Sequence, residues 1–141
     1  MPYLFDTDAI SEAFRHRPSP AYIEWLLGVP REDQFTSAVV VGELFEGAFL
    51  SGSPRHLGNI EREVLPRVGV LPYDAGAARV FGRIAATLRA EGRPLPDADL
   101  QIAATAIRHG LSLVTGNVRH FERVPDLAIE RALADARASD A

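Results

Sequence analysis

Four acidic or amide residues stand where an apolar strand or a helix is expected to begin or end: Asp6, Glu43, Asp99 and Asn117. Carboxylate and amide oxygens are the ligands that Mg²⁺ and Mn²⁺ prefer in proteins. Carboxylates that are brought close together repel one another unless a cation lies between them. The types and positions of these residues therefore predict a metal site built from oxygen ligands, with Mg²⁺ or Mn²⁺ as the ion.

Two of these residues directly follow short apolar segments. Asp6 comes after apolar residues 3–5, and Asn117 comes after residues 113–116. The carboxyl ends of parallel strands share one edge of an α/β sheet, and ligands bind at that edge. Each residue also has a purely structural interpretation, because Asp6 can cap a helix and Asn117 can form a turn after a glycine.

The other two residues fall in segments whose apolar residues recur at helical spacing. Glu43 lies near the edge of the buried stripe expected for residues 38–50, so its carboxylate needs either a metal ion or an arginine partner. Asp99 lies in a helix expected over residues 97–109, after Pro96. We expect Asp97 to cap this helix and Asp99 to face the metal. The two roles can be exchanged, and both aspartates can reach the site.

The segments that carry these residues alternate between strands and helices. Apolar runs predict strands near residues 3–5, 34–37, 68–72, 112–115 and 127–129, with helices at 21–27, 38–50, 55–65, 74–91 and 97–109. Alternation of this kind is typical of a mostly parallel sheet covered on both faces. The sequence thus predicts a three-layer α/β/α sandwich with about five strands.

The domain organisation is simple. A chain of 141 residues without repeats or linkers suits a single domain over 1–141. We expect a short helix after the first strand, capped by Asp8 or Ser11. The tail from about residue 131 is rich in alanine and charge, and we expect it to fray.

Composition excludes several classes of protein. The chain has no cysteine and no lysine, which removes disulfides, zinc–thiolate sites, cysteine nucleophiles and any mechanism based on a catalytic lysine. Walker, GxGxxG and HExxH motifs are absent, and the four histidines lack metal-ligand spacing. No apolar run is long enough for a membrane helix and the N-terminus does not read as a signal peptide, so we expect a cytoplasmic protein without membrane contact.

Four segments together resemble PIN-domain proteins and, within that group, the VapC-type ribonuclease toxins of type II toxin–antitoxin pairs. They are LFDT at residues 4–7, GELFEGA at 42–48, DLQIAATA at 99–106 and LVTGNVRHF at 113–121. Their order and spacing cover nearly the whole chain. The resemblance implies a PIN-like fold and an endoribonuclease that depends on Mg²⁺ or Mn²⁺ and cleaves an RNA such as tRNA or rRNA.

The resemblance also implies roles for particular residues. Asp6, Glu43 and Asp99 take the positions of the metal-binding carboxylates, and Asn117 takes the fourth catalytic position, where the family has Asn or Asp. An Asn there gives the site one negative charge fewer than an Asp would, so the number of bound metal ions, one or two, stays open. Two further acids near the site, Asp8 and Asp97, can supply the missing negative charge. The family further implies a homodimer and a small antitoxin protein that blocks the site.

Two other interpretations remain open. The segment Asp6-Thr7-Asp8 is similar to the opening motif of haloacid-dehalogenase-like phosphatases, but those enzymes use a later lysine that this chain lacks. A catalytically silent PIN-fold binding protein is the second alternative, against which three retained carboxylates count. If the substrate is RNA, arginines at the rim can guide its backbone, and the candidates are Arg15, Arg17, Arg89, Arg93 and Arg119.

Overall fold

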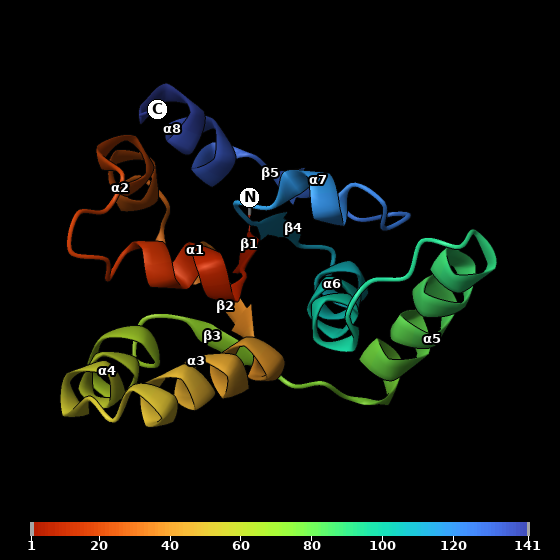
Figure 1. Ribbon diagram of the computed structural model, residues 1–141, viewed down its shortest axis with the longest axis horizontal. Helices are drawn as coiled ribbons and strands as arrows, with labels where there is room; N and C mark the ends of the chain where they lie inside the picture. The colour runs from red at the N-terminus through yellow and green to blue at the C-terminus, as the bar shows by residue number, and fades with distance from the viewer. Residues whose placement is uncertain (1, 141) are drawn as a thin grey trace.

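A five-stranded parallel sheet forms the centre of the computed structural model, which describes residues 2–140. The strands are β1 (Tyr3–Phe5), β2 (Gln34–Ser37), β3 (Gly69–Leu71), β4 (Ser112–Val114) and β5 (Ile129–Glu130). All neighbouring strands are parallel, in the order β3-β2-β1-β4-β5. Helices lie on both sides of this band of strands (Figure 1). The predicted three-layer α/β/α fold is therefore confirmed.

Eight α-helices connect and cover the strands in the described part of the chain. They are α1 (Thr7–Glu12), α2 (Pro20–Leu27), α3 (Ala38–Ser51), α4 (Pro54–Asn59), α5 (Ala75–Ala90), α6 (Asp97–His109), α7 (Val118–Phe121) and α8 (Ala132–Asp140). A 3₁₀ turn, η1 (Arg31–Asp33), precedes β2, and a π-helical turn, η2 (Ile60–Val64), follows α4. The single helix expected over 55–65 is thus divided in two. Within residues 2–140, no helix is long and apolar enough to span a bilayer.

Local chemistry sets most helix boundaries. Ser37 caps α3 by accepting the N–H of Val40, and Gly52 ends that helix in the left-handed conformation. Asp74 caps α5, as the sequence predicts, by accepting the N–H of Ala77 at 2.9 Å. Gly110 ends α6, again with a positive φ.

The order of the strands creates one switch point, where the site can form. The chain places β2 and β3 on one side of β1 and then places β4 and β5 on the other side. Leu4 of β1 pairs with Leu113 of β4, and both are fully buried. At such a reversal the loops after the two central strands diverge and leave a crevice at their carboxyl ends. Asp6 and Asn117 follow these two strands.

Four further local expectations differ from the structure. Asp6, rather than Asp8 or Ser11, caps α1. Asp97 makes no capping hydrogen bond, because Pro96 occupies the cap position and Asp97 is already the first helical residue. The last strand lies at 129–130 instead of 127–129.

The tail is the fourth difference. Residues 132–140 form the helix α8 rather than a frayed end. Leu133 and Ala136 lie three residues apart on one face, and both are buried against the core. This apolar face, together with contacts between α8 and α2, holds the segment in place.

Candidate active and metal site

A cavity of about 350 Å³ lies at the switch point of the sheet. The four residues proposed from the sequence, Asp6, Glu43, Asp99 and Asn117, all line it. Thr7, Asp8, Ile102 and Phe121 complete the lining. The fold therefore brings together side chains from the junction of β1 and α1, from α3, from α6 and from the loop after β4. The most distant of them in the sequence, Asp6 and Asn117, are 111 residues apart.

Asp6 has both a structural and an electrostatic role at the start of α1. Its Oδ1 accepts the N–H of Ala9 at 2.8 Å, and its side chain also accepts the hydroxyl of Thr115. Only 6% of the residue is exposed. Burial, with smaller contributions from the charges of Asp8 and Asp99, raises the pKa of this carboxyl to about 6 despite the two hydrogen bonds. A cation beside Asp6 would offset this cost of ionisation.

Threonines position two other residues of the pocket. The hydroxyl of Thr7 donates to Glu43 Oε1 at 2.5 Å. The first turn of α1 therefore holds the side chains of both Asp6 and Glu43 in position. On the opposite wall, the backbone N–H of Asn117 donates to Thr115 Oγ1 at 3.0 Å. Because Thr115 also donates to Asp6, the loop that carries Asn117 is fixed against the buried carboxylate. Thr115 thus positions a carboxylate through its hydroxyl.

Asp99 projects from the first turn of α6 and contacts a histidine. The distance between Asp99 Oδ2 and His120 Nε2 is 2.7 Å, and both side chains are partly buried. The ring of His120 also packs edge-on against Phe121, with the ring centroids 5.2 Å apart. This contact ties α6 to α7 at the edge of the pocket.

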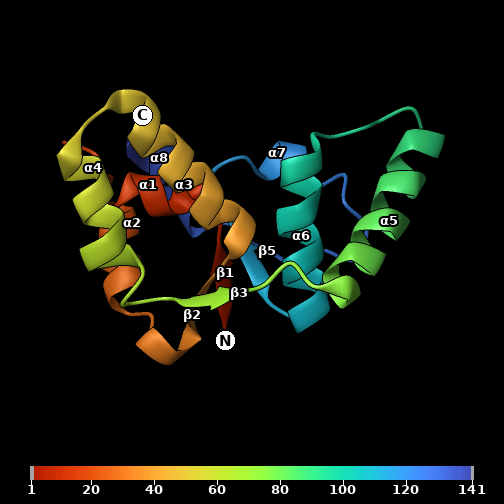
Figure 2. The same cartoon turned by 90° about the horizontal axis from the view of Figure 1, so that it is seen from below.

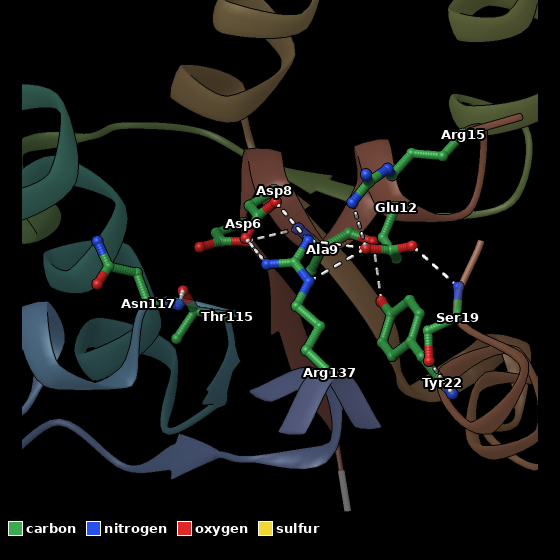
Figure 3. A network of polar contacts seen from close by, with 10 residues as sticks. All are labelled: Asp6, Asp8, Ala9, Glu12, Arg15, Ser19, Tyr22, Thr115, Asn117 and Arg137. Atoms are coloured by element: carbon green, nitrogen blue, oxygen red, sulfur yellow. Dashed lines mark hydrogen bonds and ion pairs between the residues drawn. The ribbon is translucent and has the colours of Figure 1, made fainter. Parts of the chain in front are cut away.

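A second group of charges lies directly behind the pocket. Arg137 of α8 donates to both carboxylate oxygens of Asp8, at 2.7 and 2.8 Å, and to Glu12 Oε1 at 2.8 Å (Figure 3). Glu12 Oε2 accepts the N–H of Ser19 at 3.0 Å. A Cβ atom at position 116 would collide with Arg137 and Asp8, so the loop after β4 passes this ion pair only because Gly116 has no side chain.

The two additional acids noted in the sequence differ in position. Asp8 lines the cavity, whereas Asp97 is exposed and is not among the residues that line it. The sequence reasoning missed Thr7, His120 and Arg137. Thr7 falls within the segment 4–7 that also carries the PIN resemblance, and Arg137 lies in the tail for which the sequence predicts fraying. His120 falls within the segment 113–121 that carries the PIN resemblance, which was the one available signal.

The chemistry of the pocket suits a hydrated Mg²⁺ or Mn²⁺ ion. Asp6, Glu43, Asp99 and Asn117 all offer oxygen donors, and Mg²⁺ is usually bound by one or two carboxylates while it keeps several waters. Across residues 2–140, no three His, Cys, Asp or Glu side chains are grouped closely enough to hold an ion alone. Two of the donors are engaged elsewhere, Glu43 by Thr7 and Asp99 by His120. Water ligands between the ion and the protein fit this arrangement.

Comparison with known proteins assigns the family. The chain matches the PIN domain over residues 3–127. It is 38% identical over 129 residues to a tRNA(fMet)-specific endonuclease VapC from Shigella flexneri, which covers 91% of this chain and 96% of that protein. It is 32% identical over 124 residues to the toxin FitB from Neisseria gonorrhoeae, which covers 84% of this chain and 89% of that protein.

Solved structures agree with this relationship. The FitAcB structure from Neisseria gonorrhoeae superimposes with a TM-score of 0.84 at 30% identity, covering 92% of this chain and 97% of that one. DNA-bound VapBC from Salmonella typhimurium gives a TM-score of 0.82 at 33% identity, with coverage of 92% and 97%. The chain therefore belongs to the PIN-domain family and is a relative of the VapC-type ribonuclease toxins.

Proposed function

We propose that the protein is a Mg²⁺- or Mn²⁺-dependent endoribonuclease that hydrolyses RNA phosphodiester bonds as the toxin of a toxin–antitoxin pair. The observation that carries this proposal is the convergence of Asp6, Glu43, Asp99 and Asn117 on one cavity at the switch point of the sheet. Relatives that are named ribonucleases or endonucleases support the reaction class.

Each residue has a distinct task in this proposal. Asp6, Glu43 and Asp99 would hold the ion, and Asn117 would contribute a neutral amide. When bound, the ion lowers the pKa of a water and neutralises charge on the phosphate in the transition state. Thr7 and Thr115 keep Glu43 and Asp6 in place, since each donates its hydroxyl to one of these carboxylates. The ionised form of Asp6, which burial disfavours, is the form that binds a cation.

The partners follow from the relatives. Related solved structures include a toxin–antitoxin complex and a member of the VapBC family of toxin–antitoxin systems, so we propose a small antitoxin that covers the site of this chain. We also propose a homodimer, with the whole chain acting as one nuclease domain in the cytoplasm. A tRNA is the favoured substrate over rRNA, because two of the relatives are named tRNA(fMet)-specific endonucleases.

The chain supplies matched variants for testing the proposal. Glu43→Gln and Asp99→Asn alter residues that line the cavity, while Glu46→Gln and Asp97→Asn alter exposed acids two or three positions away on the same helices. We expect cleavage of unfractionated tRNA by wild type with Mg²⁺ or Mn²⁺ and none with EDTA.

The pocket variants should lose at least about 10³-fold in rate, because a metal site contributes several kcal/mol to the transition state. The two control variants should cleave as wild type does. Equal activity in Glu43→Gln and Glu46→Gln would reject the assignment, and pocket variants as toxic to cells as wild type would favour a silent binding protein. A phospho-aspartate trapped on Asp6 would favour the phosphatase alternative instead.

A further inference from the structure

A second groove adjoins the candidate active site. It has a volume of about 570 Å³ and is lined by residues of α1, of the segment that follows α1, and of α3, α4 and η2. These helices lie together on the side of the molecule away from α5 (Figure 2). Thr7 and Glu43 line both this groove and the acidic pocket, so the two cavities meet there. A polymer seated in the pocket can therefore continue into the groove.

The charge of this groove is opposite to that of the pocket. Four carboxylates line the pocket, whereas Arg15 and Arg55 line the groove, and His16 and His56 add ring nitrogens. Among the residues that line the groove, Glu43 is the one carboxylate, and it lies at the edge shared with the pocket. We refer to this cavity below as the basic groove.

The side chains of the basic groove are placed to meet a ligand. The side chain of Arg15 is 61% exposed even though one of its nitrogens contacts Glu12 at 3.3 Å. Arg55 is exposed in the first turn of α4. Phe14 lies at the rim and is 39% exposed, which leaves part of its ring open to stacking. His56 is oriented by a contact of 2.9 Å between its Nδ1 and the hydroxyl of Ser51.

We propose that the basic groove is a subsite for the RNA strand next to the cleaved bond, with a phosphate held by Arg15 and Arg55 and a base stacked on Phe14. The inference rests on the proposed nuclease function and names how its substrate is held. Arginine suits phosphate because its planar fork donates two hydrogen bonds at once. Single-stranded RNA is commonly bound by such a combination of basic side chains and an aromatic ring.

The arrangement also solves an electrostatic problem. An acidic pocket repels the phosphate backbone that it has to cleave. A basic surface that begins at Glu43 attracts the neighbouring phosphates and so supplies binding energy away from the reacting bond. Charge complementarity thus favours an anionic ligand over a neutral one, and the continuity of the groove with the pocket favours a nucleic-acid strand over a small anion.

Binding measured without catalysis tests this subsite. Fluorescence anisotropy of end-labelled unfractionated tRNA is recorded in EDTA over a range of salt concentrations. We compare Arg55→Glu with Arg79→Glu, an exposed arginine on α5 that makes the same change in net charge but does not line the groove. Phe14→Ala is paired in the same way with Phe49→Ala, which removes a ring that is 69% exposed on α3 outside the groove. Circular dichroism verifies that each variant is folded.

We expect Arg55→Glu to weaken binding about tenfold at low salt and to reduce the salt slope by about one, since one phosphate contact is lost. Phe14→Ala should weaken binding about fivefold with little change in slope, because stacking does not depend on salt. Arg79→Glu and Phe49→Ala should bind as wild type does. A milder variant, Arg55→Gln, should fall between wild type and Arg55→Glu.

Two results would overturn the subsite. One is an identical affinity and slope for Arg55→Glu and Arg79→Glu, which would leave the basic groove to a protein partner. The other is a wild type that does not bind tRNA in EDTA. Failure of the nuclease proposal would look different, because wild type would then bind tRNA but not cleave it when Mg²⁺ is added.

Discussion

Two carboxylates at opposite ends of α1 are equally buried, yet their charges are balanced in different ways. Asp6 is 6% exposed, and burial raises its pKa to about 6. Glu12 is 2% exposed, and although burial acts in the same direction, hydrogen bonds from Arg137 and Ser19 lower its pKa overall. Arg137 thus pairs with Glu12 and Asp8, whereas the hydrogen bonds to Asp6 come from the uncharged donors of Ala9 and Thr115 (Figure 3).

This comparison shows that one short helix can carry a structural carboxylate at one end and a candidate metal ligand at the other. At Glu12 the fixed guanidinium of Arg137 satisfies the carboxylate and holds α8 against α1. At Asp6 the neighbouring charges are negative, so an ion from solution is the remaining source of compensation. A buried acid that receives only uncharged donors is therefore a better guide to a candidate metal site than burial alone.

The largest loss of stability is expected when the guanidinium that pairs with Glu12 is removed. Arg137→Met keeps much of the apolar stem but leaves a buried carboxylate with little compensation, and we expect a loss of about 3–5 kcal/mol in the free energy of unfolding. Urea unfolding at pH 7 measures it. Arg131→Met is the control, because the contact of 3.8 Å between Arg131 and Asp135 is exposed and its loss should cost less than about 1 kcal/mol.

A second substitution tests the physical cause. Glu12→Gln in the Arg137→Met background removes the unpaired charge and should recover part of the lost stability. If the double variant is no more stable than Arg137→Met alone, the cost arises from lost packing of α8 and not from the charge on Glu12.

The dependence of stability on pH should have opposite signs at the two ends of α1. The pKa of Asp6 is raised from 3.8 to about 6, so its favourable contribution is present below pH 4 and is lost as the pH rises through 6. The pKa of Glu12 is lowered, so its contribution is present above its unfolded value of 4.5 and is lost as the pH falls through the folded value.

Asp6→Asn isolates the first of these effects. The amide oxygen still accepts the N–H of Ala9, and the ionisation penalty disappears. Without metal, the variant should be more stable than wild type by roughly 3 kcal/mol at pH 8, with the difference vanishing near pH 4. Urea unfolding in EDTA at both pH values measures this. A variant that is less stable than wild type at pH 8 would contradict the raised pKa.

An added ion should abolish the difference between the two ends of the helix. At a hundredfold excess over its Kd, Mg²⁺ or Mn²⁺ should stabilise wild type by about 2.7 kcal/mol, and Tm should rise accordingly. Asp99→Asn should lose most of this shift, whereas Asp97→Asn, an exposed acid outside the cavity, should retain it. The same rise in both variants would place the ion elsewhere. Calorimetry with and without EDTA gives the measurement.

The smallest effect is expected at Asp8, the residue that belongs both to the acidic pocket and to the ion pairs of Arg137. Asp8 lines the cavity and pairs with Arg137, but its side chain is 45% exposed, so Asp8→Asn should change stability by less than about 1 kcal/mol. The charge of Asp8 also raises the pKa of Asp6, so the pKa of Asp6 should be lower in Asp8→Asn than in wild type. NMR titration of the Asp6 carboxyl carbon detects the direction. A pKa that rises would show that Arg137 no longer stays near α1.

The positions of the proposed site residues could be predicted because they depend on strand ends and helix periodicity. The apolar segments that precede Asp6 and Asn117 are short, buried and parallel, so the residues after them meet at one edge. The helices that carry Glu43 and Asp99 follow equally simple patterns. These signals are local in sequence, and the sheet then converts them into proximity.

The contacts between side chains could not be predicted in the same way. The pairing of Thr7 with Glu43 depends on how α1 crosses α3, and that of His120 with Asp99 depends on the approach of α7 to α6. Neither crossing is encoded in the spacing of residues within one element. Arg137 was missed for a related reason, because a short helix rich in alanine and charge becomes stable only through packing against the rest of the domain.

The ion pairs that Arg137 of α8 makes with Asp8 and Glu12 join residues that are synthesised at very different times. Arg137 follows Asp8 by 129 residues and Glu12 by 125. A ribosome therefore completes β1 and α1 long before it adds the guanidinium that neutralises them. Until residue 137 has been added, Asp8 and Glu12 lack the guanidinium that pairs with them in the folded chain. These two acids of the first helix thus gain their counter-ion only after residues 13–136 have been synthesised.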